Sequence, residues 1–203
     1  QSQLLFHVER PNHWNNSWDW ARFEVCGHKW GDLSETGYGV SLLNDCKYGY
    51  SIKDNAIKLS LLKSARYPDP CADMGGHDFT YALYPHSGTA VEGGTIEEAN
   101  RLNLPARAVQ GIFEDKRKIA AVTGRGVQID AVKKAEDEEY LIVRIHECRG
   151  GREKVKLYSE YPVKRFVPCN LLEHECGEAA EGSCVEFTIR PFEIRTFKMQ
   201  FED

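Results

Sequence analysis

The chain has 203 residues, of which 41% are hydrophobic and 28% charged, so it can form one large domain or two small ones with a real core. Its net charge of -5 and pI near 5.8 argue against a protein that binds the phosphate backbone of nucleic acid. No apolar run reaches the ~20 residues that a membrane-spanning helix needs. We therefore expect neither a nucleic-acid partner nor a membrane partner.

The cysteines and the first residue also carry information. The seven cysteines are odd in number and scattered, which is typical of reduced thiols in the cytoplasm rather than of a disulfide framework. The chain begins at Gln1, without methionine, and enters a strand-like run at once. We expect it to be a fragment of a longer polypeptide.

The first half is predicted to be a meander of antiparallel strands. Apolar residues that alternate or cluster between turn formers predict strands at residues 4–8, 21–28, 40–43, 50–52, 56–62 and 79–84. Lys53-Asp54-Asn55 is a hairpin turn signal. Thr95-Ile-Glu-Glu98 has the form of a capping box and predicts one short helix that stops before Pro105. The four tryptophans are expected to fill core and interface space.

After Gly124-Arg-Gly126 the sequence becomes a succession of strand-like runs, and the second half is predicted to be a small sandwich. Strands are expected at residues 127–133, 140–148, 154–158, 163–171, 185–189 and 192–201. Leu141, Val143 and Ile145 alternate with more polar neighbours, which predicts one apolar face. We place a boundary near Ile112, giving domains 1–112 and 113–203.

No complete catalytic set is recognisable. The glycine pairs fit neither a phosphate-binding loop nor a dinucleotide fingerprint, and no nucleophile elbow is present. Cys169, His174, Cys176 and Cys184 lack the paired knuckles of a structural zinc site, so no metal site is expected in this chain. A glycosidase would need two carboxylates ~5 Å apart. Candidates by clustering are Asp45, Asp69, Asp73 and Asp78, although turn roles are favoured for Asp45 and Asp69.

The stretch from Tyr38 to His86 concentrates polar and aromatic residues between strand-like runs, and it carries a resemblance to a known family. Gly39-Val-Ser-Leu-Leu-Asn-Asp-Cys-Lys-Tyr-Gly49, Leu59-Ser-Leu-Leu-Lys-Ser64 and Phe79-Thr-Tyr-Ala-Leu-Tyr-Pro-His86 closely resemble the cytosolic-type α-mannosidases of glycoside hydrolase family 38. Residues 21–34, 131–137 and 190–196 extend the resemblance over nearly the whole chain.

The resemblance implies an all-β C-terminal region of such an enzyme, cytoplasmic and of bacterial origin. Residues 1–112 would be the second part of a large antiparallel β-sandwich, a galactose-mutarotase-like supersandwich, and residues 113–203 a small C-terminal β-sandwich. In that family an N-terminal catalytic domain of the same chain holds the zinc ion and the aspartate nucleophile of a retaining mechanism. This chain alone is therefore expected to be inactive and to need no cofactor, and to form part of the cleft wall for terminal α-linked mannose of oligosaccharides.

The resemblance also singles out candidate substrate-binding residues. Family members can place a basic residue from this region near the sugar, and Lys63 is the matching position, where arginine is more usual. A lysine is a point charge on a flexible stem and lacks the planar fork of arginine, which puts a bidentate role in doubt. Asp45, Tyr48 and His77, with Lys47 and Asp73 beside them, would line the cleft or serve domain docking.

Two other classes of function stay open. The chain could be a free-standing carbohydrate-binding β-sandwich that stacks sugars on Trp14, Trp18 and Trp20, or an interaction module that only scaffolds oligomers. A large sandwich cut by the chain start would expose apolar edges. We therefore expect self-association, as in a homo-oligomer, or disorder near residues 1–16.

Overall fold

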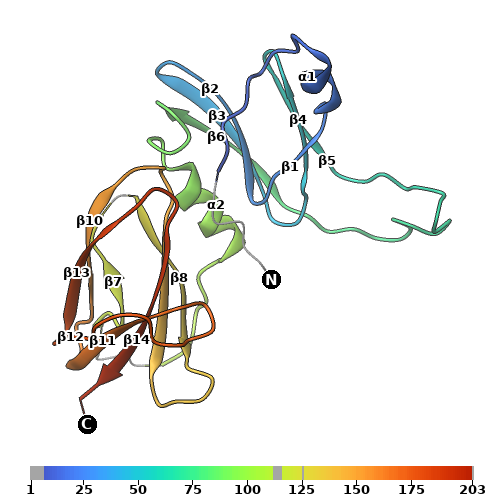
Figure 1. Cartoon of the computed structure of the whole chain (residues 1–203). Helices are drawn as coiled ribbons and strands as arrows, with labels where there is room; N and C mark the ends of the chain where they lie inside the picture. Colours follow the sequence, from blue (N-terminus) through green and yellow to red (C-terminus); the bar gives the residue numbers. More distant parts are fainter. Residues whose placement is uncertain (1–6, 112–115, 125, 203) are drawn as a thin grey trace. The chain divides into compact units, whose positions relative to one another are not determined.

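A computed structural model describes residues 7–111, 116–124 and 126–202 (Figure 1). Within these ranges the chain is built of antiparallel strands with two short helices, which confirms the all-β prediction but gives one helix more than expected. It divides into two compact units, Val8–Val109 and Gln110–Asp203, with His7 belonging to the second. The expected strand at residues 4–8 lies largely outside the described residues.

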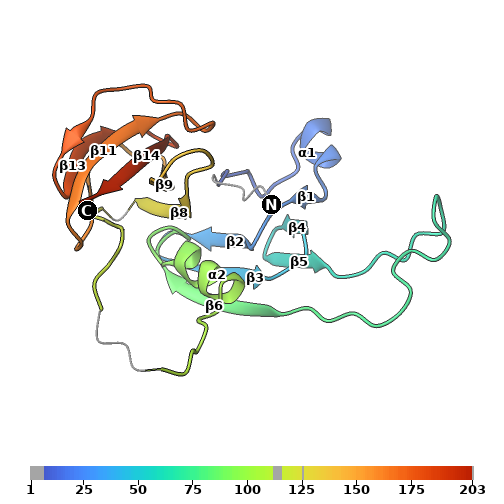
Figure 2. The same cartoon turned by 90° about the horizontal axis from the view of Figure 1, so that it is seen from below.

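The first unit contains a sheet of three strands in the order β2 (Trp30–Glu35), β3 (Tyr38–Asn44) and β6 (Tyr81–Ser87). Helix α2 (Thr95–Asn103) contacts β2 and β3 and lies along one face of this sheet, as Figure 2 shows. Ser41 on the central strand is opposite Asp32 on one side and Tyr84 on the other. Because side chains alternate along a strand, these residues share one face of the sheet.

A second sheet of the first unit has the order β1 (Val25–Cys26), β4 (Gly49–Lys53) and β5 (Ala56–Ser60). The predicted hairpin between β4 and β5 is confirmed, with Asp54 in the turn at φ 53°. Tyr50 of β4 is 1% exposed and packs on Gly31, where an added Cβ would come within 2.6 Å of the ring. Glycine at this position therefore allows the two sheets to approach each other.

Both helices depart from expectation. Helix α1 (Ser17–Ala21) was not predicted and precedes most of the strand expected at residues 21–28; the Asn16 side chain accepts from the Asp19 amide at 3.0 Å and caps the turn. Trp18 is 75% and Trp20 65% exposed, so the prediction that the tryptophans fill core space is wrong for these two.

Helix α2 confirms the predicted helix but not its capping box. Its N-cap is Gly94, at φ 83°, and the amide of Glu98 donates to the Gly94 carbonyl rather than to the Thr95 hydroxyl. The side chain of Thr95 instead bonds Ser41 of the sheet beneath the helix. The hydrogen bond between Thr95 and Ser41 therefore takes the place of the predicted capping bond between Thr95 and Glu98.

The second unit is a sandwich of two sheets, and all six strands predicted for it are found. One sheet has the order β13 (Cys184–Ile189), β10 (Glu153–Tyr158), β7 (Ala121–Val122). The other has the order β12 (Ala180–Glu181), β11 (Val163–Cys169), β14 (Ile194–Phe201), β9 (Leu141–Glu147), β8 (Val127–Lys134). The buried core is formed by Val127, Val143, Ile145, Val155, Leu157, Val163, Phe166, Ile189, Phe197 and Met199.

Two further findings concern membrane-spanning helices and disulfide bonds. In the part of the chain that the structure describes, no helix has the length and apolar character needed to cross a membrane. None of the seven cysteines, all of which are described, forms a disulfide.

Candidate functional site

The most distinctive feature of the first unit is the segment 61–80 between β5 and β6, which we call the arm. It runs out beyond the strands of its own unit and back again, as Figure 1 shows, and it contains neither helix nor strand. Tyr67 on the arm is 89% exposed and Met74 72%. Connections of this length without regular structure are uncommon in compact domains and usually serve a function.

Asp73 gives the arm its shape. Its carboxylate accepts the backbone amides of Lys63 at 3.1 Å and Ser64 at 2.9 Å. These bonds, the Ser64 amide first, lower the pKa of Asp73 below its usual value because they stabilise the charged form. The Nε2 atom of His77 lies 2.9 Å from the Asp73 carbonyl oxygen. One carboxylate thus ties the outgoing limb of the arm to its return.

The base of the arm is fixed by a second carboxylate. Asp45 follows β3, and its carboxylate accepts the Thr80 amide at 3.0 Å, while the Asp45 amide donates to the Thr80 carbonyl at 3.2 Å. A hydrogen bond from the Cys46 side chain is the main cause that lowers the pKa of Asp45. The predicted turn role of Asp45 is therefore confirmed.

Two more residues of the base lie beside aromatic rings. Lys47 Nζ lies 4.8 Å from the centre of the Phe79 ring, and the Tyr48 ring packs on His28 with 4.5 Å between ring centres. Tyr48 remains 52% exposed. Both side chains therefore have a structural contact and also an accessible surface.

The four predicted substrate-binding residues are only partly brought together. Lys63 and His77 meet at Asp73 on the arm, Asp45 holds the arm's base, and Tyr48 belongs to a separate aromatic contact. The charge of Lys47 contributes to lowering the pKa of Asp73, which associates Lys47 with the arm as well. The side chain of Lys63 is exposed and offers hydrogen-bond donors suited to hydroxyl groups.

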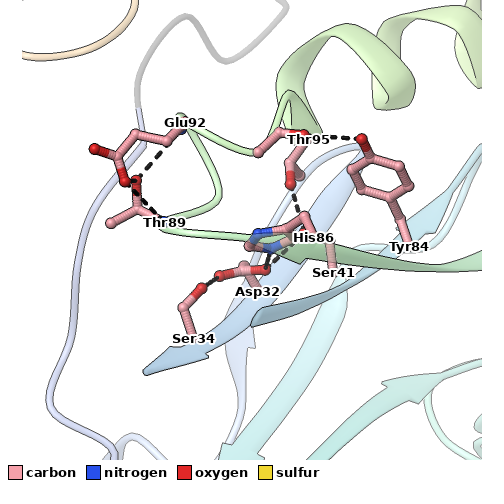
Figure 3. Close-up of polar contacts among 9 residues, drawn as sticks. Asp32, Ser34, Ser41, Tyr84, His86, Thr89, Glu92 and Thr95 are labelled. Atoms are coloured by element: carbon pink, nitrogen blue, oxygen red, sulfur yellow. Dashed lines mark hydrogen bonds and ion pairs between the residues drawn. The ribbon is translucent and has the colours of Figure 1, made fainter. Parts of the chain in front are cut away.

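A buried polar cluster lies between helix α2 and its sheet, and sequence reasoning missed it (Figure 3). His86 of β6 and Asp32 of β2 are joined by a 2.8 Å contact between Nε2 and Oδ1. The Ser41 hydroxyl lies 2.6 Å from the same Asp32 oxygen and 2.7 Å from the Thr95 hydroxyl, and Ser34 donates to the other carboxylate oxygen. No motif announces this cluster, because its members come from three strands and a helix.

The cluster contains serine, histidine and aspartate but is not a nucleophilic triad. Ser41 donates to the carboxylate of Asp32 and not to His86, so no base would activate its hydroxyl. Ser41 is fully buried and His86 is 7% exposed, which leaves no access for a substrate. Nδ1 of His86 has no hydrogen-bond partner within the described ranges, which favours the tautomer with its proton on Nε2. The cluster joins helix to sheet.

The described residues bring together no group of three or more histidine, cysteine, aspartate or glutamate side chains that could hold a metal ion. Cys169 is buried and Cys176 exposed, and the four residues considered above as zinc ligands do not converge. The described residues therefore offer no set of donors that fits a zinc ion.

Fold and arm together define an antiparallel β region of two units with one projecting loop. Two family models match it: "Glycosyl hydrolases family 38 C-terminal domain" at residues 3–71, and "Glycosyl hydrolases family 38 C-terminal beta sandwich domain" at residues 126–197. Together they span more than half of the chain. The chain therefore belongs to glycoside hydrolase family 38, as its C-terminal region.

Curated relatives agree with the family models. Alpha-mannosidase G of Dictyostelium discoideum is 43% identical over 95% of this chain, and alpha-mannosidase 2C1 of Homo sapiens is 42% identical over 93%. An alpha-mannosidase of Saccharomyces cerevisiae is 37% identical over 96%. The chain spans only 19% to 20% of the length of these relatives. A bacterial origin stays a prediction.

A solved structure shares the fold. The crystal structure of an alpha-mannosidase from Enterococcus faecalis superposes with a TM-score of 0.73 and 23% identity, covering 98% of this chain and 23% of that one. The similarity spans both units, which supports the β architecture described above.

Proposed function

We propose that this chain is the non-catalytic C-terminal portion of a zinc-dependent, retaining α-mannosidase that hydrolyses terminal α-linked mannose from oligosaccharides in the cytoplasm. The observation that carries the proposal is its family membership, together with relatives that are named alpha-mannosidases. Residues 1–112 and 113–203 would be the end of the large supersandwich and the small C-terminal sandwich.

We divide the roles in catalysis and in substrate binding according to the side chains that the described residues present. They present no cluster suited to zinc, so we assign the ion and the nucleophile to an N-terminal catalytic domain of the same polypeptide. We assign to the arm a place in the wall of the substrate cleft. Its support is the projection of the arm, its exposed Lys63 and the carboxylate of Asp73, which holds the Lys63 backbone in place.

Substitution of Lys63 in the full-length enzyme tests the cleft-wall role. Lys63→Ala should raise KM for an aryl α-mannoside about tenfold, equivalent to about 1.4 kcal/mol of lost binding. Lys58→Ala is the matched control, because Lys58 is an exposed lysine on the neighbouring strand β5. Equal kinetics for the two variants would overturn the role of Lys63.

The chain alone provides a second test. Supplied with zinc, it should release no aryl aglycone from an α-mannoside, since the nucleophile lies elsewhere in the proposed enzyme. Turnover above the level of a zinc-only blank would overturn the assignment of catalysis to another domain.

One observation favours a second candidate, a carbohydrate-binding module. Trp18 and Trp20 present large exposed rings on helix α1, and such rings can stack on sugar faces. Calorimetry of the isolated chain with a mannoside would support this candidate if heat of binding appears and is lost in Trp18→Ala.

A further inference from the structure

The loop between β11 and β12 lies over the outward face of the five-stranded sheet of the second unit. Arg144 and Lys198 alternate with core residues along β9 and β14, so their side chains point outward. Arg144 Nη2 donates to the Leu171 carbonyl at 3.3 Å, and Lys198 Nζ lies 3.7 Å from the carboxylate of Glu175. We call residues 170–176 the leucine loop.

Polar groups of the leucine loop itself fix its backbone. The Asn170 side chain accepts the amides of Leu172 at 2.9 Å and His174 at 3.0 Å, and the Asn170 amide donates to the His174 carbonyl at 2.9 Å. Glu173 fastens the loop to the sheet, because its carboxylate lies 2.8 Å from Lys133 Nζ. A loop that is ordered in advance loses little conformational entropy when a partner binds.

The side chains of the leucine loop are distributed in the reverse of the usual order. A loop that only covers a sheet turns its apolar side chains toward the protein and its charged side chains toward water. Here the Glu173 side chain is 12% exposed, whereas Leu171 is 59% and Leu172 75% exposed. Two adjacent leucines on an ordered turn therefore form an apolar contact surface that stays exposed in the described structure.

The surroundings of the leucine loop are acidic. The turn at residues 136–139 lies beside the loop, since Glu173 accepts the amide of Glu136 at 2.9 Å. The turn, the loop and the residues just after it carry seven carboxylates, on Glu136, Asp137, Glu138, Glu139, Glu173, Glu175 and Glu178. Four cationic side chains lie among them, on Lys133, Lys134, Arg144 and Lys198. The balance is three negative charges, so a partner surface should be positively charged.

The outward face of the other sheet of the sandwich has a hollow of the opposite charge. Its volume is about 470 Å³, within the size range of pockets that accept a ligand. The residues that line it include Thr123, Lys154, Lys156, Glu186, Phe187 and Thr188. Two lysines outweigh one glutamate there, so the hollow is positively charged. The apolar stems of Lys154 and Lys156 can contact leucine while their ammonium groups reach carboxylates at the rim.

The leucine loop and the hollow cannot meet within one molecule. The loop lies on the outward face of one sheet and the hollow on the outward face of the other. The buried core, which includes Phe166 and Leu157, separates them, and packed sheets lie about 10 Å apart. Contact between these two surfaces therefore requires a second copy of the chain.

We propose that the second unit carries a self-association surface, in which the leucine loop of one copy inserts Leu171 and Leu172 into the hollow at Lys154 and Lys156 of a second copy. The exposed leucines and the opposite charges of the two surfaces carry the proposal. Because the surfaces lie on opposite faces, two copies cannot pair reciprocally, and the contact joins them head to tail into chains or larger rings. The proposal uses the second unit alone and does not depend on the proposed function.

Mixing two variants of the chain tests the proposal. Leu172→Glu disables the loop and keeps the hollow, whereas the double change Lys154→Glu and Lys156→Glu disables the hollow and keeps the loop. In sedimentation equilibrium the mass of the wild-type chain should rise with concentration beyond that of a dimer, and each variant alone should stay a monomer. An equimolar mixture should form a dimer and nothing larger, because it contains only one kind of intact loop and one kind of intact hollow.

Controls separate this contact from other kinds of association. Leu104→Glu, at a leucine 65% exposed in the first unit, should associate as the wild type does. Leu172→Ala should keep the wild-type unfolding midpoint, since the loop is held by backbone atoms and by Asn170, and should weaken association about tenfold. It replaces Leu172→Glu if the midpoint of that variant falls.

Four results would overturn the proposal. These are a wild-type chain that stays monomeric at every concentration, a mixture of the two variants that stays monomeric, loop variants that associate like the wild type, and a loss of association in Leu104→Glu as well. A wild-type mass that stops at a dimer also overturns it, because it would indicate a two-fold contact elsewhere on the chain.

Discussion

Nε2 of His86 and Oδ1 of Asp32 lie 2.8 Å apart and connect the two outer strands of the β2-β3-β6 sheet beneath helix α2. The Asp32 carboxylate also accepts from Ser41 and Ser34, so one buried acceptor serves three donors. The Ser41 hydroxyl also forms a hydrogen bond with the Thr95 hydroxyl at the start of the helix.

Removal of this acceptor should destabilise the first unit. Asp32→Ala leaves buried donors without a partner and should cost about 2 kcal/mol, because an unsatisfied buried group loses its full solvation. All four tryptophans lie in the first unit, so urea unfolding followed by tryptophan fluorescence reports on this unit alone. Glu35→Ala, at the exposed end of β2, is the control, and equal midpoints for the two variants would refute the role of Asp32.

Tyr50 should make the first unit sensitive to alkali. Burial is the main cause that raises the pKa of Tyr50 to about 12, while the hydrogen bond with Asn44 opposes the rise. Above pH 10 the unfolded tyrosine releases a proton that the folded state keeps, so stability falls as pH rises from 10 to 12. The loss should reach about 3 kcal/mol, and Tyr50→Phe should abolish this part of the slope in urea titrations. Parallel slopes for both proteins would contradict the prediction.

The regular parts of this fold could be predicted from the sequence because their causes are local. The alternation along Leu141, Val143 and Ile145 predicts β9, and Lys53-Asp54-Asn55 predicts the β4–β5 hairpin, as the structure confirms. Helix α1 at residues 17–21 was not predicted, because a single turn capped by Asn16 gives no helical period in the sequence.

The candidate site was predictable only in part. The arm's polar density is visible in the sequence, and the turn roles of Asp45 and Asp69 are confirmed, the latter by its bond from the Cys71 amide at 2.9 Å. The partnership of Asp32 with His86 joins residues 54 positions apart, and no local pattern encodes it. Whether Lys63 contacts a sugar stays a prediction, because the resemblance alone suggests it.

Glu147 should be the most sensitive carboxylate of the second unit. It is 1% exposed, and its two oxygens accept the amides of Arg149 at 2.8 Å, Gly150 at 2.9 Å, Gly151 at 3.2 Å and Phe192 at 2.9 Å. It thereby fastens the turn after β9 to the turn before β14. Glu147→Ala should cost about 3 kcal/mol, since several amides lose their acceptor together.

Because the second unit has no tryptophan, this change is best followed by hydrogen exchange and mass spectrometry of peptides from β9 and β10. Their exchange should quicken by about a hundredfold in Glu147→Ala, in line with 3 kcal/mol. Glu178→Ala, an exposed carboxylate on a loop of the same unit, should leave it unchanged. Similar exchange in both variants would show that Glu147 does not fasten the two turns.

Acid should loosen the arm at Asp73. The bonds from the Ser64 and Lys63 amides lower the pKa of Asp73 below 3.8, so the folded arm favours the charged carboxylate. A group with a lowered pKa stabilises the fold above its unfolded pKa, and this contribution is lost as pH falls through the folded value. The amide proton resonances of Ser64 and Lys63 should therefore shift upfield together below pH 3.8, with one common midpoint.

Asp73→Asn should abolish that titration, whereas Asp78→Asn, an exposed aspartate on the same arm, should preserve it. A midpoint at or above 3.8, or a titration that survives in Asp73→Asn, would show that another group holds the two limbs of the arm.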